Sequence, residues 1–240
     1  MDDLPRLDAL PDGFATTVAS LHRVAEQIVA PARKPDNEIA LEATPGGFGT
    51  PFFEHGGSRH QVRVEGAELV HAEGNRERRA PLESLAAAAE AVAELLPEAE
   101  SDDEPLAADP ASTRALGEWY GFGAAILTRL LATATTADAA TPVRLWPEHF
   151  DIAIELGAES DGVRANYGAS PGDGDHPEPY LYVGPWSAEI EGDLWRATGF
   201  KGAELTYAEL LEAADQGAAA LDFFTIRKDA LATTARHRQA

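Results

Sequence analysis

Two runs in the middle of the chain alternate between apolar and polar residues, which is the pattern of neighbouring strands in an antiparallel sheet. The first run covers residues 150–156 and the second covers 163–167, and glycines at 157 and 162 mark a turn between them. We expect a hairpin whose core-facing pairs are Ile152–Tyr167, Ile154–Ala165 and Leu156–Val163. The polar face then carries Glu155 beside Arg164, and the same alternation places His149 and Asp151 on it. A shift of the strand register by one residue would bury the guanidinium of Arg164, so the alternation excludes such a register.

The other apolar residues predict further strands and helices. Spacings of three and four residues indicate helices from Phe14 to Pro31, from Pro81 to Pro97 and after Asp109, and a capping box of Thr206 and Glu209 begins another. Strands are expected at 37–43, 61–66 and 67–72, and a turn-rich loop at 44–57. Strands interleaved with helices, together with the hairpin, predict an α+β fold. We expect an antiparallel sheet that helices cover largely on one face.

An acidic, proline-containing stretch without apolar periodicity divides the chain. We expect an N-terminal half at 1–100 with a helix, three strands and a helix, an acidic linker at 101–112, and a C-terminal half at 113–240 that carries the hairpin. The two halves are expected to form one compact unit. Each half contains strands and helices, so the possibility of two similar halves remains open. No residue-level identity supports an internal repeat.

Composition excludes several classes of function. The chain has 41 acidic and 19 basic residues and a net charge of −22, which repels nucleic acid and anionic lipid. The N-terminal residues lack the basic and apolar regions of a signal peptide, and no run of about 18 apolar residues occurs. We therefore expect a cytoplasmic protein with neither a nucleic-acid nor a membrane partner. With no cysteine, thiolate chemistry is excluded, and any bound metal must use His, Asp or Glu ligands.

The stretch from Leu145 to Trp186 concentrates aromatic, histidine and aspartate residues in a chain otherwise rich in Ala and Glu. Aromatic walls suit a small-molecule site, because they supply apolar surface while their polar atoms orient the ligand. Core packing explains the same aromatic residues equally well. The residues that we predict to bind a ligand are Trp146, His149, Asp151, Asn166, Tyr180, Tyr182 and Trp186.

A second hypothesis for the same stretch is a bound divalent metal. Its predicted ligands are His149, Asp151, Asp173 and His176, because imidazole and carboxylate groups bind such ions. An ordinary acidic turn with a hydrogen-bonded histidine is the simpler explanation. An EF-hand is excluded, since Pro177 stands where the third ligand belongs. The GxSxG pattern around Ser170 is also rejected as a nucleophile elbow, because Pro171 has no backbone N–H for an oxyanion hole.

Four motifs of the chain carry a resemblance to known sequences. LWPEHFD at 145–151, NYGASPGD at 166–173, HPEPYLYVGPW at 176–186 and ATPGGFGTP at 43–51 resemble a family of actinobacterial proteins. The resemblance spans most of the chain and implies no activity, cofactor or catalytic residue. Three functions remain. The first is small-molecule binding at the aromatic, His- and Asp-lined surface of the C-terminal half; the alternatives are a metal-assisted or His/Asp-based hydrolase and a protein–protein interaction module.

Overall fold

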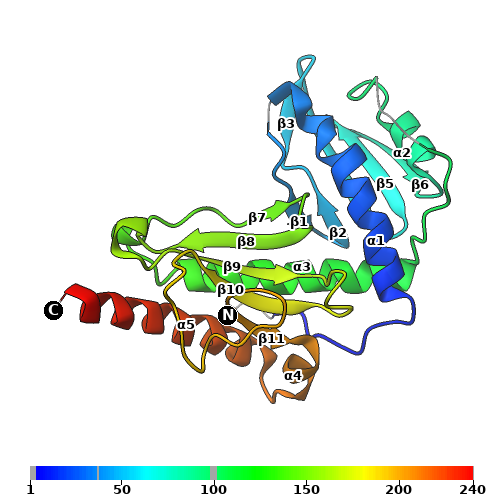
Figure 1. The fold of residues 1–240 in the computed structure, drawn as a ribbon. Coiled ribbons are helices and arrows are strands. Elements are labelled where there is room, and N and C mark those ends of the chain that lie inside the picture. Colours follow the sequence, from blue (N-terminus) through cyan, green and yellow to red (C-terminus); the bar gives the residue numbers. More distant parts are fainter. Residues whose placement is uncertain (1–3, 37, 98–101, 240) are drawn as a thin grey trace. The chain divides into compact units, whose positions relative to one another are not determined.

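The computed structural model of the protein describes residues 4–36, 38–97 and 102–239, without the side chains of 34–36 and 237–239. Its described residues form five α-helices and two antiparallel sheets, so the predicted α+β fold is confirmed (Figure 1). The chain divides into two compact units. We call residues 9–121 with 144–151 the N-terminal unit, and residues 1–8, 122–143 and 152–240 the C-terminal unit. Both units are discontinuous in sequence, and the linker predicted at 101–112, whose first residue lies outside the described residues, stays a prediction.

The sheet of the N-terminal unit is a meander with one added strand. Its strands follow the order β1-β2-β4-β5-β6, and β3 pairs with β4. Their bounds are β1 Glu42–Thr44, β2 Gly47–Gly49, β3 Phe53–His55, β4 Ser58–Glu65, β5 Glu68–Glu73 and β6 Arg76–Pro81. The short strand β7 (Arg144–Trp146) also belongs to this unit, where Leu145 bridges Leu41.

Two helices of the N-terminal unit precede and follow this sheet. Helix α1 (Phe14–Val24) continues into a π-helix (Ala25–Val29), which ends before Pro31 as the apolar periodicity predicts. Its apolar stripe is buried, with Leu21, Val24 and Ile28 fully covered. Helix α2 (Leu85–Ala91) is capped by the Ser84 hydroxyl, which accepts the N–H of Ala87 at 3.2 Å.

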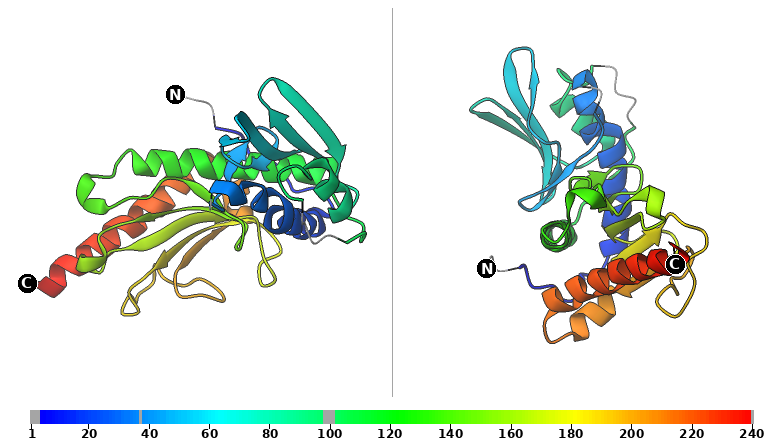
Figure 2. Two further views of the ribbon diagram at one scale, coloured as in Figure 1. Left: turned by 90° about the horizontal axis from the view of Figure 1, so that it is seen from above. Right: turned by 90° about the vertical axis from the view of Figure 1, so that its left-hand side faces the viewer.

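The C-terminal unit is a sheet with helices on one side. The strands β11 (Ala203–Thr206), β10 (Tyr180–Pro185), β9 (Ala165–Ser170) and β8 (Asp151–Leu156) lie in that order and are all antiparallel. The last part of α3 (Pro110–Leu131) and α5 (Gln216–Gln239) cover one face, while α4 (Tyr207–Glu212) follows β11 (Figure 2). Phe224 of α5 packs edge-on against Tyr167, and Gly123 of α3 lies so close to β9 that a Cβ there would be 2.8 Å from that of Ala169.

The central hairpin has the predicted faces but not the predicted register. Strands β8 and β9 pair Ile152 with Ala169, Ile154 with Tyr167 and Leu156 with Ala165, two residues away from our expectation. The shift preserves which side chains face the core, because side-chain direction repeats every two residues. The cause is a longer connection, in which a 3₁₀ turn (Glu159–Asp161) and Val163 lie in the loop. Glu155 still forms an ion pair with Arg164.

Other boundaries differ where short strands or prolines interrupt the pattern. The strand predicted at 37–43 exists only as β1, and residue 37 lies outside the described residues. The expected loop at 44–57 contains β2 and β3, whose apolar side chains are too few to show alternation. Pro81 ends β6 rather than opening a helix. The capping box of Thr206 and Glu209 is confirmed, and so is the helix start after Asp109, whose carboxylate accepts the N–H of Ser112 at 2.8 Å.

No α-helix in the described part of the chain combines the length and apolar character needed to cross a membrane.

Candidate functional site

The predicted site residues fall into two groups. Trp146, His149 and Asp151 belong to the N-terminal unit, and the other six belong to the C-terminal unit: Asn166, Asp173, His176, Tyr180, Tyr182 and Trp186. We describe each group within its own unit.

The C-terminal group lies on the sheet face opposite α3 and α5. Tyr182 pairs with Gly168 on one side and with Glu204 on the other, and Gly184 pairs with Asn166. Cross-strand partners project from the same face, so Asn166, Tyr182 and Glu204 share it. The intervening residues, such as Val183 and Leu181, are fully buried on the helix side.

Glycine at position 168 lets the ring of Tyr182 lie against the sheet. A Cβ added to Gly168 would be 2.5 Å from two ring carbons of Tyr182 and 2.6 Å from its hydroxyl oxygen. The ring is also in contact with Tyr180, at a centroid distance of 6.2 Å, and edge-on with Phe200, at 6.2 Å. The ring orientation of Tyr182 is therefore set by β9 on one side and by the 186–202 loop on the other.

The ring of Trp186, at the other end of this face, is held by two contacts. Its Nε1–H donates to Asn166 Oδ1 at 2.8 Å, and the guanidinium of Arg164 lies 5.0 Å from the ring centroid. The residue is nevertheless 47% exposed. Between Trp186 and Tyr182 lies Gly184, where an added Cβ would meet no atom within 4 Å. The face thus has an open space above Gly184, bordered by two aromatic side chains.

His176 lies between two carboxylates next to the aromatic residues. Its Nδ1 is 3.2 Å from Asp173 Oδ1, and its Nε2 is 3.2 Å from Glu204 Oε2. The imidazole packs on the ring of Tyr180 at a centroid distance of 4.4 Å. Neutral imidazole has one N–H, so both contacts are hydrogen bonds only when the ring carries a proton on each nitrogen. We call Asp173, His176, Tyr180 and Glu204 the His176 cluster.

Asp173 organises the loop before β10. Its Oδ1 accepts the backbone N–H groups of Asp175 and His176, each at 2.8 Å, and its Oδ2 accepts the Tyr180 hydroxyl at 2.8 Å. Burial by itself raises the pKa of Asp173, but these hydrogen bonds together outweigh it, and the pKa is lowered. The carboxylate is therefore ionised, and its acceptor positions are used to order the loop.

The geometry of the His176 cluster bears on two hypotheses, a His/Asp-based hydrolase and a metal-assisted hydrolase. A general base needs a ring nitrogen that can reach a substrate proton, whereas both nitrogens of His176 face carboxylate oxygens. Within the part of the chain that the structure describes, no group of three or more His, Asp or Glu side chains is arranged to hold a metal ion. The His176 cluster is built to order the loop and the Tyr180 ring.

Two members of this arrangement were missed at the level of sequence. Glu204 comes from β11, where the alternation of Ala203, Glu204 and Leu205 was the available signal. Its other oxygen accepts the hydroxyl of Thr198 at 3.1 Å. Phe200 lies in a loop without periodicity, so only tertiary packing reveals its contact with the tyrosines.

In the N-terminal unit, the LWPEHFD motif forms a turn rather than a continuous strand. His149 is exposed in this turn, and Asp151 is 5% exposed at the start of β8, so the two do not share the polar strand face that we expected. Phe150 between them has a φ of 53°, which is rare for a bulky residue and breaks the alternation. Trp146 is half-buried, and Arg144 lies 6.0 Å from its ring centroid.

Buried contacts hold Phe150 in this conformation. Its carbonyl oxygen accepts the Tyr120 hydroxyl at 2.6 Å, and its ring stacks on His22 with centroids 5.0 Å apart. Burial, followed by the charge of Asp151, raises the pKa of Tyr120 well above its ordinary value. Tyr120 therefore acts as a permanent hydrogen-bond donor to the motif.

A pair of buried histidines elsewhere in the N-terminal unit was also missed. His60 of β4 and His71 of β5 are 4% and 1% exposed, and His71 Nδ1 lies 3.3 Å from Glu94 Oε1. Alternation predicted strands here but gave no reason to place two imidazoles side by side.

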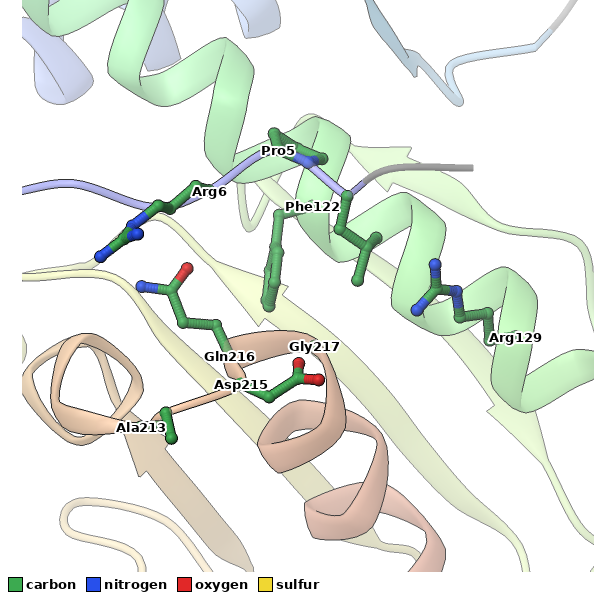
Figure 3. A pocket seen from close by; sticks show the side chains of 10 residues that line it. Pro5, Arg6, Phe122, Arg129, Ala213, Asp215, Gln216 and Gly217 are labelled. Atoms are coloured by element: carbon green, nitrogen blue, oxygen red, sulfur yellow. The ribbon is translucent and has the colours of Figure 1, made fainter. Parts of the chain in front are cut away.

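A cavity of 360 Å³ in the C-terminal unit contains none of the predicted site residues (Figure 3). Phe122 and Arg129 of α3 line it together with Leu4, Pro5, Arg6 and residues 213–217. The Gln216 side chain fixes the N-terminal segment beside it, since it accepts the N–H of Leu7 at 2.9 Å and donates to the Leu7 carbonyl at 3.0 Å.

Comparisons with known proteins leave the resemblance to the actinobacterial family a prediction. No family model, no curated protein and no solved structure matches this chain.

Proposed function

We propose that the protein binds a small planar molecule in the open space above Gly184, on the face of the C-terminal sheet that α3 and α5 leave uncovered. The observation that carries the proposal is the contrast between two glycines of this face. Tyr182 fills the space above Gly168, whereas nothing lies within 4 Å of a Cβ at Gly184.

The residues around this space suit a flat ligand. Tyr182 and Trp186 project from the same face of β10 and its end, about 13 Å apart along the strand, so one ring can enter between them. Aromatic rings prefer offset or edge contacts with one another, which favours an aromatic guest over an aliphatic one. Asn166 supplies an amide that already orients Trp186 through its oxygen.

Both borders of the space are ordered before any ligand enters. Trp186 is fixed by Asn166 and Arg164, and Tyr182 by Gly168, Tyr180 and Phe200. The His176 cluster supports this end by packing its imidazole on Tyr180. Preorganised side chains lose little conformational entropy on binding, so a small ligand can gain useful affinity.

Substitution of Gly184 gives a direct test. Gly184→Val fills the space, and valine favours strands, so the fold should keep its stability. The control is Gly174→Val, because a Cβ added at Gly174 would also meet nothing within 4 Å, but this residue lies in the 171–179 loop. Ligand binding is measured by saturation-transfer NMR. The wild-type protein should give a signal with benzamide and a weaker signal with cyclohexanecarboxamide, which has the same amide group on a non-aromatic ring.

The expected result is that Gly184→Val removes the benzamide signal and Gly174→Val keeps it. Equal signals from the two amides, or equal losses in the two variants, would overturn the proposal. If wild-type protein instead self-associates through Trp186, and Trp186→Ala abolishes association without changing the benzamide signal, an interaction module replaces the small-molecule site.

A further inference from the structure

The N-terminal unit contains a separate cavity of 390 Å³ beside the LWPEHFD turn. Its apolar lining comes from Ala30, Pro31, Ile39 and Pro147. Ile39 is 46% exposed, although isoleucine is among the residue types most often buried. A ligand that covers Ile39 would remove this apolar surface from water, which favours binding.

The charged residues that line this cavity are all acidic, and two of them have a basic neighbour outside the lining. Glu26, Glu38 and Glu148 come from three separate segments and complete the cavity wall. Glu26 lies 3.9 Å from His22 Nε2, and Glu38 lies 3.4 Å from Arg144 Nη1. Carboxylates around an apolar surface attract a cation and repel an anion, so charge complementarity selects the class of ligand.

The backbone that forms the cavity is unusual on two sides. Glu26 lies in the π-helix Ala25–Val29, whose wide turn is closed by the Ala30 N–H donating to the Ala25 carbonyl at 2.9 Å. Such turns are rare in helices and frequent at functional sites. On the other side, Pro147 and Glu148 lie three and two residues before Phe150, which has a positive φ. Strained residues of this kind persist where surrounding contacts hold them.

The wall formed by the motif is rigid. His22 makes a 2.8 Å hydrogen bond with the Pro147 carbonyl oxygen, and its ring is parallel to that of Phe150 within 3°. His22 therefore fixes the carbonyl of one motif residue and the ring of another. A ligand therefore meets a preformed surface on the side of the cavity that the motif forms.

We propose that this cavity binds a small organic cation with an apolar body, an amine or guanidine whose alkyl part covers Ile39 and Pro147 while its charge meets the glutamates. The volume lies within the range of small-molecule sites. This site is independent of the space above Gly184, because it belongs to the other unit and selects by charge rather than by planarity.

The test uses three probes with the full chain in calorimetric or NMR titrations. n-Hexylammonium should bind, hexanoate of the same length should not, and methylammonium, which lacks the apolar body, should bind much more weakly. Raising the NaCl concentration should weaken hexylammonium binding, because exposed charges are screened. Hexanoate binding as tightly as hexylammonium would overturn the proposal, and so would the absence of hexylammonium binding.

Variants place the probe in the cavity. Ile39→Ala should weaken hexylammonium binding about fourfold for each methylene group that no longer packs against the protein, and Glu148→Gln should weaken it about two- to fivefold. The matched controls are Ile226→Ala, at an isoleucine that is 50% exposed, and Glu212→Gln, both in the C-terminal unit. The proposal would be overturned if the cavity variants and the control variants weakened hexylammonium binding equally. It would also be overturned if Gly184→Val abolished hexylammonium binding while the cavity variants kept it. Neither result would affect the benzamide experiment.

Discussion

His60 and His71 are joined by a buried contact in which His60 Nδ1 lies 3.0 Å from His71 Nε2. The other nitrogen of His60 lies 3.1 Å from the carbonyl oxygen of His55, to which it can donate. A neutral His60 then accepts at Nδ1 and His71 donates at Nε2, so the neutral pair satisfies both contacts. An additional proton on His71 has to be placed in a buried site.

The pKa of His71 is lowered, chiefly by burial and further by the positive charge of Arg78, although the carboxylates of Glu94 and Glu73 oppose the shift. The unfolded chain therefore takes up this proton at a higher pH than the folded protein. Stability from His71 is present above the ordinary histidine pKa of about 6.5 and is lost as the pH falls below it. We expect the free energy of unfolding to decline below that pH by at most about 1.4 kcal/mol per pH unit from this group.

Urea unfolding between pH 8 and pH 5 measures this decline. His71→Asn should flatten the pH dependence, whereas the exposed His149→Asn should leave it as in the wild type. If His71→Asn and wild type have the same slope, the buried pair does not set the pH dependence.

Gly168→Ala should displace the Tyr182 ring, because the new Cβ would lie 2.5 Å from it. We expect a loss of about 1–3 kcal/mol in the free energy of unfolding, the usual effect of overpacking. In the Tyr182→Ala background the same change should cost much less. A double-mutant cycle by urea unfolding measures this coupling, and additive effects would show that the ring does not constrain position 168.

Gly117→Ala should destabilise the N-terminal unit, although alanine normally favours a helix by about 1 kcal/mol over glycine. A Cβ at Gly117 would lie 2.6 Å from the backbone nitrogen of Gly47 and 2.7 Å from the carbonyl carbon of Gly46. Backbone atoms cannot rotate away, so we expect a loss of about 2 kcal/mol or more.

Thermal and urea unfolding measure the effect of Gly117→Ala, and Gly217→Ala is its control. At Gly217 the short contact is with the end of the flexible Leu4 side chain, at 2.4 Å, which can move. A neutral or stabilising Gly117→Ala would contradict the close approach of α3 to the β1–β2 turn.

Local patterns were sufficient for most long elements. The stripe from Phe14 to Ile28 predicted a helix that ends before Pro31, and the alternation at 150–167 predicted which side chains face the core. These patterns repeat over many residues, so they survive a few exceptions. The strands β2 and β3 have three residues each, which is too few for a period to show.

Part of the candidate site could also be found in the sequence. Tyr180 and Tyr182 alternate with Leu181 and Val183 in the sequence, which is the pattern of a strand, and these residues lie in β10. Their partners Phe200 and Glu204 come from a later loop and strand, so local sequence could not connect them. Likewise, His60 and His71 are eleven residues apart in the sequence, and their side chains meet only because β4 pairs with β5.

The sequence by itself determined the α+β class, the buried faces of its long elements and the absence of cysteine chemistry. Each depends on composition or on a short period, which acts within one element. The tertiary structure alone decided the hairpin register, the positive φ of Phe150 and the open space above Gly184. Those features depend on loop length and on side chains from distant segments. A shift of two residues in the strand register leaves the alternation of apolar and polar residues unchanged, and so does an aromatic ring contributed by another segment.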